Sequence, residues 1–587
     1  VNFPVFLKGI TIMSMNQIPR PEHPEPIWER SSWENLNGTW EFAFDHGRSA
    51  RDRGLYRSEE KLPLEILVPF CPESRLSGIE YKDFIDAVCY RRHFEISKER
   101  LDGRIFLHFG AVDYKAYVYI NGELAGTHLG GYASFALDIT KLVREGDNTV
   151  FVWALDDIRS GRQPRGKQSG QFASAGCDYT RTTGIWQTVW LEFLPKEYIK
   201  YAKYFTDVNA GTLTIIGETV GKGNLTIASS FEGAPTGSTE VDCVGGGFTA
   251  TIKLTEKHLW ELGKGGLYDL VLTFGDDTVK SYFGLRSVAL DGMKFRLNGK
   301  SVFQRLVLDQ GFYPDGIYTA PTDADLEKDI ELSMACGFNG ARLHQKVFEA
   351  RFLYYADRHG YMVWDEMGNW GFDCGAAQAT EIYLNEWMEV VARDFDHPSV
   401  IGWCPFNETW SYMQKDGTNT LLSTIYNMTK MYDPTRPVID TSGGYHFVTD
   451  IYDVHDYDQD PDSFRKHYEK LSEGEIFDWL ATRTPSMTQK WKGEPVFVSE
   501  YGGIGWKTDG TDGWGYGKNP EGEEEFVTRF TRLTHVLLDN PLIMGFCYTQ
   551  LYDIEQEVNG LYTYERVPKF DVAQFKRACE KKAAVED

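Results

Sequence analysis

The chain has 587 residues, 42% of them hydrophobic and 25% charged. This is the composition of a folded globular protein too long for one hydrophobic core, so two to four domains are expected. A formal net charge of −25, with no long run of Lys or Arg, excludes proteins that bind nucleic acid or anionic membranes through a basic surface. Nine cysteines without CxxC spacing predict reduced thiols and a cytoplasmic location.

Residues 1–195 are expected to form the first domain, which is rich in β-strands. Short alternating or apolar runs recur, and Asn121-Gly122 and Gly130-Gly131 provide turns between them. The runs are residues 38–44, 104–109, 115–120, 148–155 and 187–193. Because no periodic segment of helical length competes, the pattern favours a jelly-roll-like β-sandwich.

Residues 196–290 continue the alternation at shorter spacing. The runs are residues 212–216, 224–229, 248–254 and 268–274. A domain of this length with such strands predicts an immunoglobulin-like β-sandwich.

Residues 291–587 have a different texture, in which buried-type strands alternate with amphipathic helices. The expected strands are 302–308, 339–343, 362–365, 400–405, 437–440, 451–455, 496–500 and 543–548. Clear helices are expected at 324–336, 382–395 and 523–538, the first with an N-cap near Thr322. Eight strands with intervening helices predict a (β/α)₈ barrel, also called a TIM barrel.

Two glutamates stand at strand ends of this barrel, where catalytic groups gather. The fourth strand leads into Asn407-Glu408 and the seventh ends in Glu500. Glycoside hydrolysis needs such a pair, one carboxyl to protonate the leaving oxygen and another to attack the anomeric carbon or activate water. The alternative is that either glutamate has only a structural role. The occurrence of two glutamates at strand ends argues against this alternative.

Several motifs resemble glycoside hydrolase family 2, which contains β-galactosidases, β-glucuronidases and β-mannosidases. Besides Asn407-Glu408 and Glu500, they are residues 21–40 with Trp28, residues 178–186 ending in Gly-Ile-Trp, residues 337–344 and residues 363–366. The order sandwich, immunoglobulin-like domain, barrel is also the order in this family. The resemblance implies a retaining exo-β-glycosidase.

The resemblance also implies roles for individual residues. Glu500 is expected to be the nucleophile, kept ionised by Arg342 beneath it. Glu408 is expected to be the acid/base, and Asn407 to bind the sugar 2-hydroxyl. Asp178 is expected to reach in from the first domain to a distal hydroxyl, unless it only caps a local loop.

Three further strand-end residues are candidates for contacts in the pocket. His344 resembles a position that contacts sugar hydroxyls, although a satisfied structural histidine is the alternative. Either Tyr457 or His455 is expected to approach Glu500, with Tyr457 favoured.

Aromatic side chains are expected to shape the rest of the pocket. Tyr548 stands where the family often places a Trp that forms a platform for the sugar. Trp370 and Trp410 are candidates for the aglycone side, and core packing explains either one equally well.

Neither a metal nor an organic cofactor is predicted. The acidic string at residues 553–557 has side chains in mixed directions and no accompanying His pattern, so we do not expect it to form a metal site.

The glycone is left open between several sugars. β-Glucuronidases of the family carry an Asn-x-Lys pair, but here Asn559-Gly560-Leu561 has Leu in place of Lys. Lys569 or Arg566 could replace that cation, so β-glucuronide and β-galacturonide stay as alternatives. A neutral β-hexoside, galactoside first, is preferred, and α-L-arabinopyranoside is a further candidate.

The expected partner is a carbohydrate substrate, and the resemblance implies a homo-oligomer. A non-catalytic carbohydrate-binding protein on the same scaffold is the alternative from another class. The presence of Glu408, Glu500, Asn407 and Arg342 together argues against it.

Overall fold

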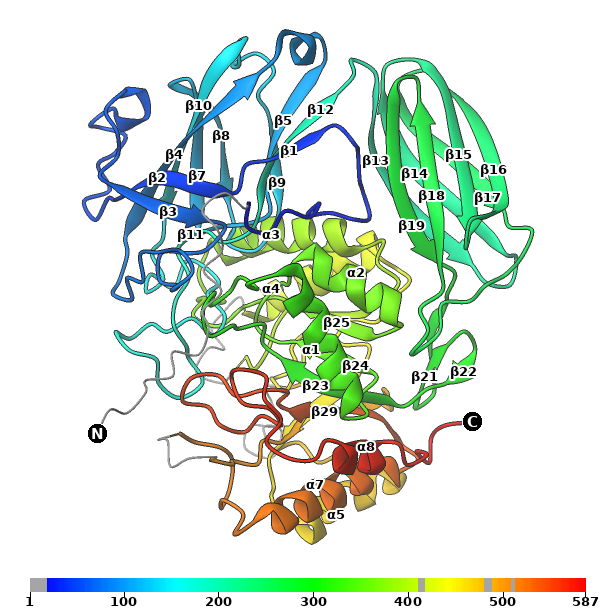
Figure 1. Ribbon diagram of the computed structural model, residues 1–587. Helices are drawn as coiled ribbons and strands as arrows, with labels where there is room; N and C mark the ends of the chain where they lie inside the picture. The colour runs from blue at the N-terminus through cyan, green and yellow to red at the C-terminus, as the bar shows by residue number, and fades with distance from the viewer. Residues whose placement is uncertain (1–17, 410–417, 480–487, 508–512) are drawn as a thin grey trace, which may run out of the picture.

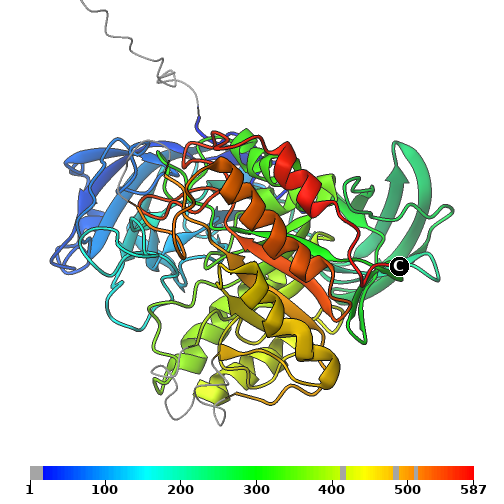
Figure 2. The same cartoon turned by 90° about the horizontal axis from the view of Figure 1, so that it is seen from below.

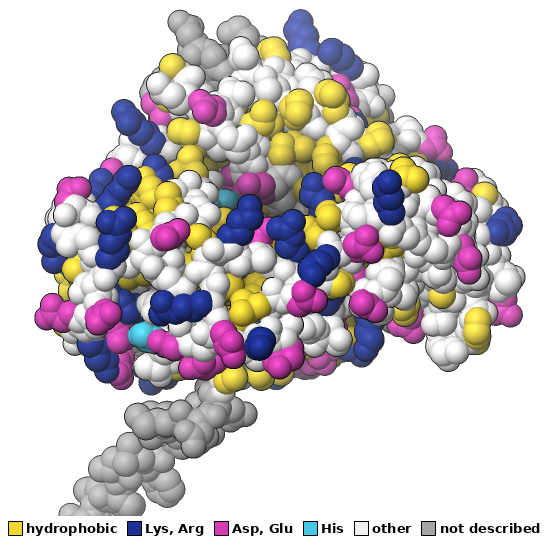
Figure 3. Space-filling model, turned by 90° about the horizontal axis from the view of Figure 1, so that it is seen from above, with side chains coloured by type: hydrophobic (Ala, Val, Ile, Leu, Met, Phe, Trp, Pro, Cys, Tyr) yellow, Lys and Arg dark blue, Asp and Glu magenta, His cyan; other side chains and the backbone are white. Residues whose placement is uncertain are grey.

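The structure is a computed structural model that describes residues 18–409, 418–479, 488–507 and 513–587. Two β-sandwiches lie side by side over one end of a region that mixes helices with a parallel sheet (Figure 1). On the face seen in Figure 3, acidic and basic side chains are interspersed, and hydrophobic side chains gather beside a hollow. None of the helices in the described part of the chain is long and apolar enough to cross a membrane.

The first sandwich is built from two antiparallel sheets. One has the order β1-β12-β5-β9 and the other β3-β2-β4-β10-β7-β8. In β5, Ile105, Leu107 and Phe109 are buried and alternate with more exposed residues, as expected of a strand with one face on a core. The elements are β1 (Trp33–Asn35), β2 (Gly38–Phe44), η1 (Leu55–Arg57), β3 (Leu64–Val68), β4 (Ala87–Ile96), η2 (Lys98–Asp102), β5 (Arg104–Phe109), β6 (Val112–Asp113), β7 (Lys115–Ile120), β8 (Glu123–Leu129), β9 (Phe135–Asp138), β10 (Gly146–Leu155), β11 (Gly184–Ile185) and β12 (Val189–Leu194).

A long loop, residues 156–183, leaves this sandwich and docks on the parallel sheet region. The Arg165 N–H donates to Trp370 O at 3.0 Å, and the Gly166 N–H donates to Gly368 O at 3.1 Å. Gly166 has φ +57, and a Cβ there would lie 2.1 Å from Gln345 O. Only glycine permits this close approach of two backbones.

The second sandwich has sheets of three and four antiparallel strands, in the orders β13-β14-β17 and β16-β15-β18-β19. This is the two-sheet, immunoglobulin-like arrangement that the sequence predicts. Its strands are β13 (Tyr198–Asp207), β14 (Thr212–Val220), β15 (Gly223–Phe231), β16 (Ala234–Cys243), β17 (Gly246–Lys253), β18 (Leu267–Phe274) and β19 (Asp277–Gly284). A small sheet of β20 (Val288–Asp291), β21 (Lys294–Leu297) and β22 (Lys300–Ser301) leads into the next region.

The third region is a (β/α)₈-type barrel. Within the described part of this region, seven parallel strands have the order β26-β25-β24-β23-β29-β28-β27. They are β23 (Gln304–Asp309), β24 (Gly340–Leu343), β25 (Met362–Glu366), β26 (Val400–Cys404), β27 (Tyr452–Asp456), β28 (Val496–Gly502) and β29 (Ile543–Thr549). Each begins within two residues of its predicted start.

The prediction of an eighth strand at residues 437–440 is wrong, because the structure has no regular strand there. The segment joins β26 only through isolated parallel bridges, Trp403↔Val438 and Asn407↔Ser442. The Val438 N–H donates to the Asp450 carboxylate at 2.9 Å. It therefore cannot donate to a backbone carbonyl of a neighbouring strand, as a regular sheet requires. The segment nevertheless stands between β26 and β27, because the Asp450 N–H donates to Val438 O at 3.0 Å.

Helices flank the parallel strands, and Figure 2 shows α5, α7 and α8 along the outer side. The Thr322 N–H donates to the Asp325 carboxylate at 2.9 Å at the start of α1, a capping contact close to the predicted position. The helices are α1 (Asp323–Ala335), α2 (Ala350–His359), α3 (Ala379–Asp394), α4 (Thr418–Tyr432), α5 (Pro461–Glu469), η4 (Lys470–Glu473), α7 (Glu523–Leu538) and α8 (Ala573–Cys579).

Candidate active site

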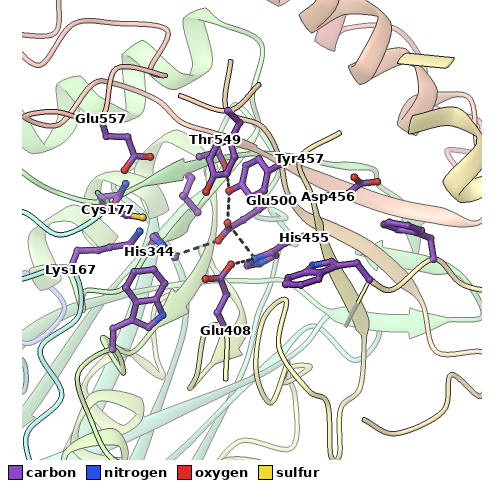
Figure 4. A pocket seen from close by; sticks show the side chains of 16 residues that line it. Lys167, Cys177, His344, Glu408, His455, Asp456, Tyr457, Glu500, Thr549 and Glu557 are labelled. Carbon is purple, nitrogen blue, oxygen red and sulfur yellow. Dashed lines mark hydrogen bonds and ion pairs between the residues drawn. The ribbon is translucent and has the colours of Figure 1, made fainter. Parts of the chain in front are cut away.

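A pocket of about 480 Å³ opens at the carboxyl ends of the parallel strands. Both predicted carboxylates, Glu408 and Glu500, line it (Figure 4). The loop from the first sandwich contributes Lys167 and Cys177 to its wall. The pocket therefore combines groups from two regions that are far apart in the sequence.

Glu500 lies near the end of β28 and is 4% exposed. Its Oε2 accepts a hydrogen bond from the Tyr457 hydroxyl at 2.5 Å, and its Oε1 is 3.1 Å from a guanidinium nitrogen of Arg342. Burial raises the pKa of Glu500, but the positive charges of His455 and Arg342 outweigh burial and hold the pKa well below its ordinary value. Glu500 is thus kept as a carboxylate, the form that a nucleophile requires.

Arg342, at 0% exposure in β24, connects several of these groups. Its Nε donates to Glu366 at 2.7 Å, and a terminal nitrogen donates to Asn407 Oδ1 at 2.6 Å. Burial raises the pKa of Glu366, but Arg342 and His344 lower it to about 2. With Oδ1 engaged, the buried Nδ2 of Asn407 has no partner among the described residues, so it is available to donate to a ligand.

Glu408 follows β26 in a backbone conformation that is uncommon for residues other than glycine, with φ +47. Two hydrogen bonds support this conformation: the Glu408 N–H donates to Ser442 O at 2.8 Å, and the Asn407 N–H donates to Asn369 Oδ1 at 2.8 Å. The turn directs the Glu408 carboxylate to His455 Nδ1 at 2.7 Å.

His455 lies between the two carboxylates (Figure 4). Its Nδ1 is 2.7 Å from Glu408 Oε1 and 3.3 Å from Glu500 Oε2. Burial lowers the pKa of His455, but the Glu500 and Glu408 carboxylates outweigh burial and raise it above its ordinary value. The histidine thus places a positive charge and a transferable proton between the two carboxyl groups.

One oxygen of each glutamate and a ring nitrogen of His455 all lie within 4.8 Å of one another. Such a group could in principle hold a cation. However, the same nitrogen already links both carboxylates, and the raised pKa of His455 disfavours the neutral ring that a metal needs. The absence of a metal requirement stays a prediction.

Three more predicted residues contact the pocket. His344 lines it, and burial lowers the pKa of His344 to about 4, so the ring is neutral near neutral pH. Trp370 lines it too, with its Nε1 unpartnered among the described residues. Tyr457 lines it and stacks on Tyr516 at 3.6 Å between ring centroids.

Two predicted residues are not among those that line the pocket. Asp178 turns its carboxylate to Arg165 at 3.3 Å, and its neighbour Cys177 lines the pocket instead. Tyr548 is fully buried and packs on Phe530 at 4.8 Å between ring centroids. Because side chains alternate along β29, Thr549 is the residue that reaches the pocket. The position of Tyr548 corrects the expectation of a platform. A sugar contact from Asp178, whose Oδ1 is buried without a partner among the described residues, stays a prediction. Trp410 lies outside the described residues.

Lys569 and Arg566, which could have replaced the Lys of the Asn-x-Lys pair, are also engaged elsewhere. Lys569 Nζ donates to Asp553 at 2.6 Å, and Arg566 pairs with Asp329 at 3.1 Å. Neither lines the pocket.

Sequence reasoning missed several residues of the pocket wall, namely Lys167, Cys177, Asp456, Tyr516, Thr549 and Glu557. Lys167 and Cys177 belong to a loop with no strand-end position to mark them. Glu557 lies in the acidic string at residues 553–557, where the mixed directions of the side chains hid the one that enters the pocket. Asp456 follows His455 directly at the end of β27, so the rule that chemistry gathers at strand ends could have found it.

Paired carboxylates at strand ends of a parallel barrel are the arrangement that glycoside hydrolysis requires. Family models agree over most of the chain. Residues 33–195 match the model described as "Glycosyl hydrolases family 2, sugar binding domain", and residues 291–581 match "Glycosyl hydrolases family 2, TIM barrel domain". The chain belongs to glycoside hydrolase family 2.

Relatives within the family carry different names. The β-glucuronidase of Rattus norvegicus is 26% identical, over 91% of this chain and 88% of its own length. The β-galactosidase of Thermoanaerobacter pseudethanolicus is 27% identical over 54% of this chain, which spans only 44% of that longer protein. The fold matches the β-glucuronidase of Ruminococcus gnavus, solved in complex with D-glucuronic acid, with a TM-score of 0.79 at 19% identity, covering 96% of this chain and all of that one.

Proposed function

We propose that the protein is a retaining exo-β-glycosidase that cleaves a terminal sugar by double displacement. The observation that carries the proposal is the proximity of Glu408 and Glu500, whose nearest oxygens lie within 4.8 Å. Retaining enzymes hold their carboxyl groups about 5–5.5 Å apart, whereas inverting enzymes need about 6.5–9.5 Å to admit a water molecule.

In the first step Glu500 attacks the anomeric carbon while Glu408 protonates the departing oxygen. Tyr457 and Arg342 hold the Glu500 carboxylate in place, and His455, at 2.7 Å, orients Glu408. In the second step Glu408 takes a proton from water, which attacks the glycosyl-enzyme intermediate. The free Nδ2 of Asn407 is placed to donate to a sugar hydroxyl.

The pocket shape supports exo action. The docked loop of the first sandwich, with Lys167 and Cys177, closes one side of the site. A pocket of about 480 Å³ suits one sugar ring and part of its aglycone better than it suits the middle of a long chain.

Two kinds of glycone are candidates for the substrate, a β-glucuronide and a neutral β-hexoside. The names of relatives and structural neighbours favour a β-glucuronide over a β-galactoside. The pocket lining favours a neutral β-hexoside, since among the described residues four acidic side chains line the pocket, those of Glu408, Asp456, Glu500 and Glu557, against the single lysine Lys167.

The test is a panel of p-nitrophenyl glycosides, assayed with wild type, Glu500→Ala and Glu408→Ala. The panel contains β-galactoside, β-glucuronide, β-glucoside, β-mannoside and α-L-arabinopyranoside. We expect both variants to lose at least about 1,000-fold in kcat, and azide to restore part of the activity of Glu500→Ala. Unchanged turnover in either variant would remove that residue from the mechanism. No turnover of any glycoside by wild type would favour a carbohydrate-binding protein.

A further inference from the structure

Lys167 is a buried cation in the pocket wall. The residue is 5% exposed, and its ammonium lies 4.3 Å from the centre of the Trp370 ring. Among the described residues, neither a hydrogen bond nor an ion pair engages this ammonium. An ammonium that faces the pocket without a protein partner is available to donate to a bound ligand.

The backbone fixes where this side chain starts. The Gly166 N–H donates to Gly368 O at 3.1 Å, and Lys167 O accepts from the Tyr179 N–H at 2.6 Å. Lys167 is therefore held on both sides of its Cα, and the stem reaches into the pocket from a defined point (Figure 4).

Glu557 lines the same side of the pocket (Figure 4). It is 2% exposed, accepts from Asn559 Nδ2 at 3.0 Å and also accepts from the Tyr179 hydroxyl. No ion pair joins Glu557 to Lys167 in the described part of the chain, although each carries charge that affects the other. The two groups thus face the pocket separately, one as a donor and the other as an acceptor.

We propose that Lys167 and Glu557 bind neighbouring hydroxyl groups of a neutral glycone, Lys167 donating to one hydroxyl and Glu557 accepting from the next. This inference rests on the proposed glycosidase function and names the substrate class of the same site. It makes the first sandwich a direct contributor to sugar specificity.

A hydroxyl pair fits these groups better than a sugar carboxylate does. A uronate bound to Lys167 would add a carboxylate to a pocket whose lining, in the part of the chain that the structure describes, already has four acidic side chains, with Glu557 on the same side. Lys569 and Arg566, the two cations that the sequence suggested as partners of a uronate, are paired with Asp553 and Asp329 instead. A hydroxyl both accepts and donates, so one neutral diol satisfies both side chains without adding charge.

The experiment uses Lys167→Met and Glu557→Gln in the full chain, with kcat/KM measured on the p-nitrophenyl β-galactoside and β-glucuronide. We expect each variant to lose about 10- to 100-fold on the neutral glycoside, since a hydrogen bond to a charged group is lost. Lys82→Met, an exposed lysine of the same sandwich, is the matched control and should match wild type. Thermal unfolding of all three variants excludes misfolding as the cause.

Deoxy substrates separate binding from a structural role. The 3-deoxy and 4-deoxy forms of the better neutral glycoside are assayed with wild type and Lys167→Met. For wild type, kcat/KM of one deoxy substrate should be about 10- to 100-fold lower than kcat/KM of the parent sugar. For Lys167→Met, the same deoxy substrate should lose no more than about 3-fold relative to the parent sugar. If the loss from the substitution and the loss from removing the hydroxyl were additive, Lys167 would not bind that hydroxyl, and the proposal would be overturned.

The opposite specificity would also overturn the proposal. If Lys167→Met lost only β-glucuronide hydrolysis and kept the neutral activity, Lys167 would bind a carboxylate. If neither variant changed any substrate while Glu500→Ala was inactive and rescued by azide, this proposal would fail and the glycosidase function would stand. Full activity of Glu500→Ala would instead reject the glycosidase mechanism itself.

Discussion

Glu500 depends on neighbouring groups for its ionisation. Burial alone raises the pKa of this carboxyl, and His455, Arg342 and the Tyr457 hydroxyl reverse that effect. The residue types were predictable, because each stands at or near a strand end. Which of His455 and Tyr457 approaches Glu500 was not predictable, and the structure brings both close, at 3.3 Å and 2.5 Å.

We predict that Tyr457→Phe lowers kcat by about 10- to 100-fold, since a hydrogen bond to a charged group is worth about 1.5–3 kcal/mol. Losing this bond raises the pKa of Glu500, so more of the enzyme is protonated at low pH. The acidic limb of the kcat/KM profile should therefore move to higher pH. Tyr117→Phe, in β7 of the first sandwich, is the control. A normal rate with an unmoved acidic limb would show that Tyr457 does not tune Glu500.

Glu366 supports stability through its pair with Arg342. Its pKa is lowered to about 2, against about 4.3 in an unfolded chain. A lowered pKa stabilises the fold above the unfolded value, and this contribution is lost as the pH falls through the folded value. We predict that Glu366→Gln is about 3 kcal/mol less stable at pH 7, and that the difference shrinks from about pH 4.3 toward 2.

Urea unfolding of wild type and Glu366→Gln at several pH values checks this prediction. The exposed Glu123→Gln is a matched control that should show little difference at any pH. A difference between Glu366→Gln and wild type that is constant with pH would contradict the role given to the Arg342 pair.

At the scale of elements, the docked loop at residues 156–183 matters most. Its backbone contact with Gln345 requires glycine at position 166. We predict that Gly166→Ala displaces the loop and lowers kcat/KM by about 10- to 100-fold, because Lys167 is the next residue. Enzyme kinetics, with circular dichroism for the fold, measures this.

Gly176→Ala is the matched control in the same loop. Gly176 has a similar φ of +60, but a Cβ there meets nothing within 4 Å. The two variants share the backbone penalty, and only Gly166→Ala adds the clash. Equal losses in both would show that general strain, rather than the docking contact, explains the effect.

The strand β29 provides a second test at this scale. Tyr548 does not line the pocket, and its ring is fully buried against Phe530. We predict that Tyr548→Phe keeps wild-type kcat/KM, since the side chain does not line the pocket, and that it changes the free energy of unfolding by no more than about 1.5 kcal/mol, the contribution of one hydrogen bond. Steady-state kinetics and thermal unfolding test this. A loss of sugar affinity would restore Tyr548 as a platform.

For the whole molecule, the sequence predicted the three β and α/β regions and the two carboxylates. Strands such as β28 could be predicted because each is an apolar run that ends in polar residues. Their neighbours in the barrel could also be predicted, because strands of a barrel pair in chain order. The contact of Gly166 with Gln345 joins residues 179 positions apart and has no local pattern, so Lys167 was missed. The segment at 437–440 looked like a strand because its apolar residues are visible, whereas the Asp450 side chain that takes the Val438 N–H is not. The homo-oligomer and the cytoplasmic location stay predictions.

The most direct test of the central claim is the stereochemistry of hydrolysis. Proton NMR would follow the first minutes of cleavage of the best β-glycoside by wild type, before the released sugar mutarotates. The spacing of Glu408 and Glu500 within 4.8 Å predicts that the β-anomer appears first, as double displacement requires. First appearance of the α-anomer would mean inversion, and would contradict Glu500 as a nucleophile.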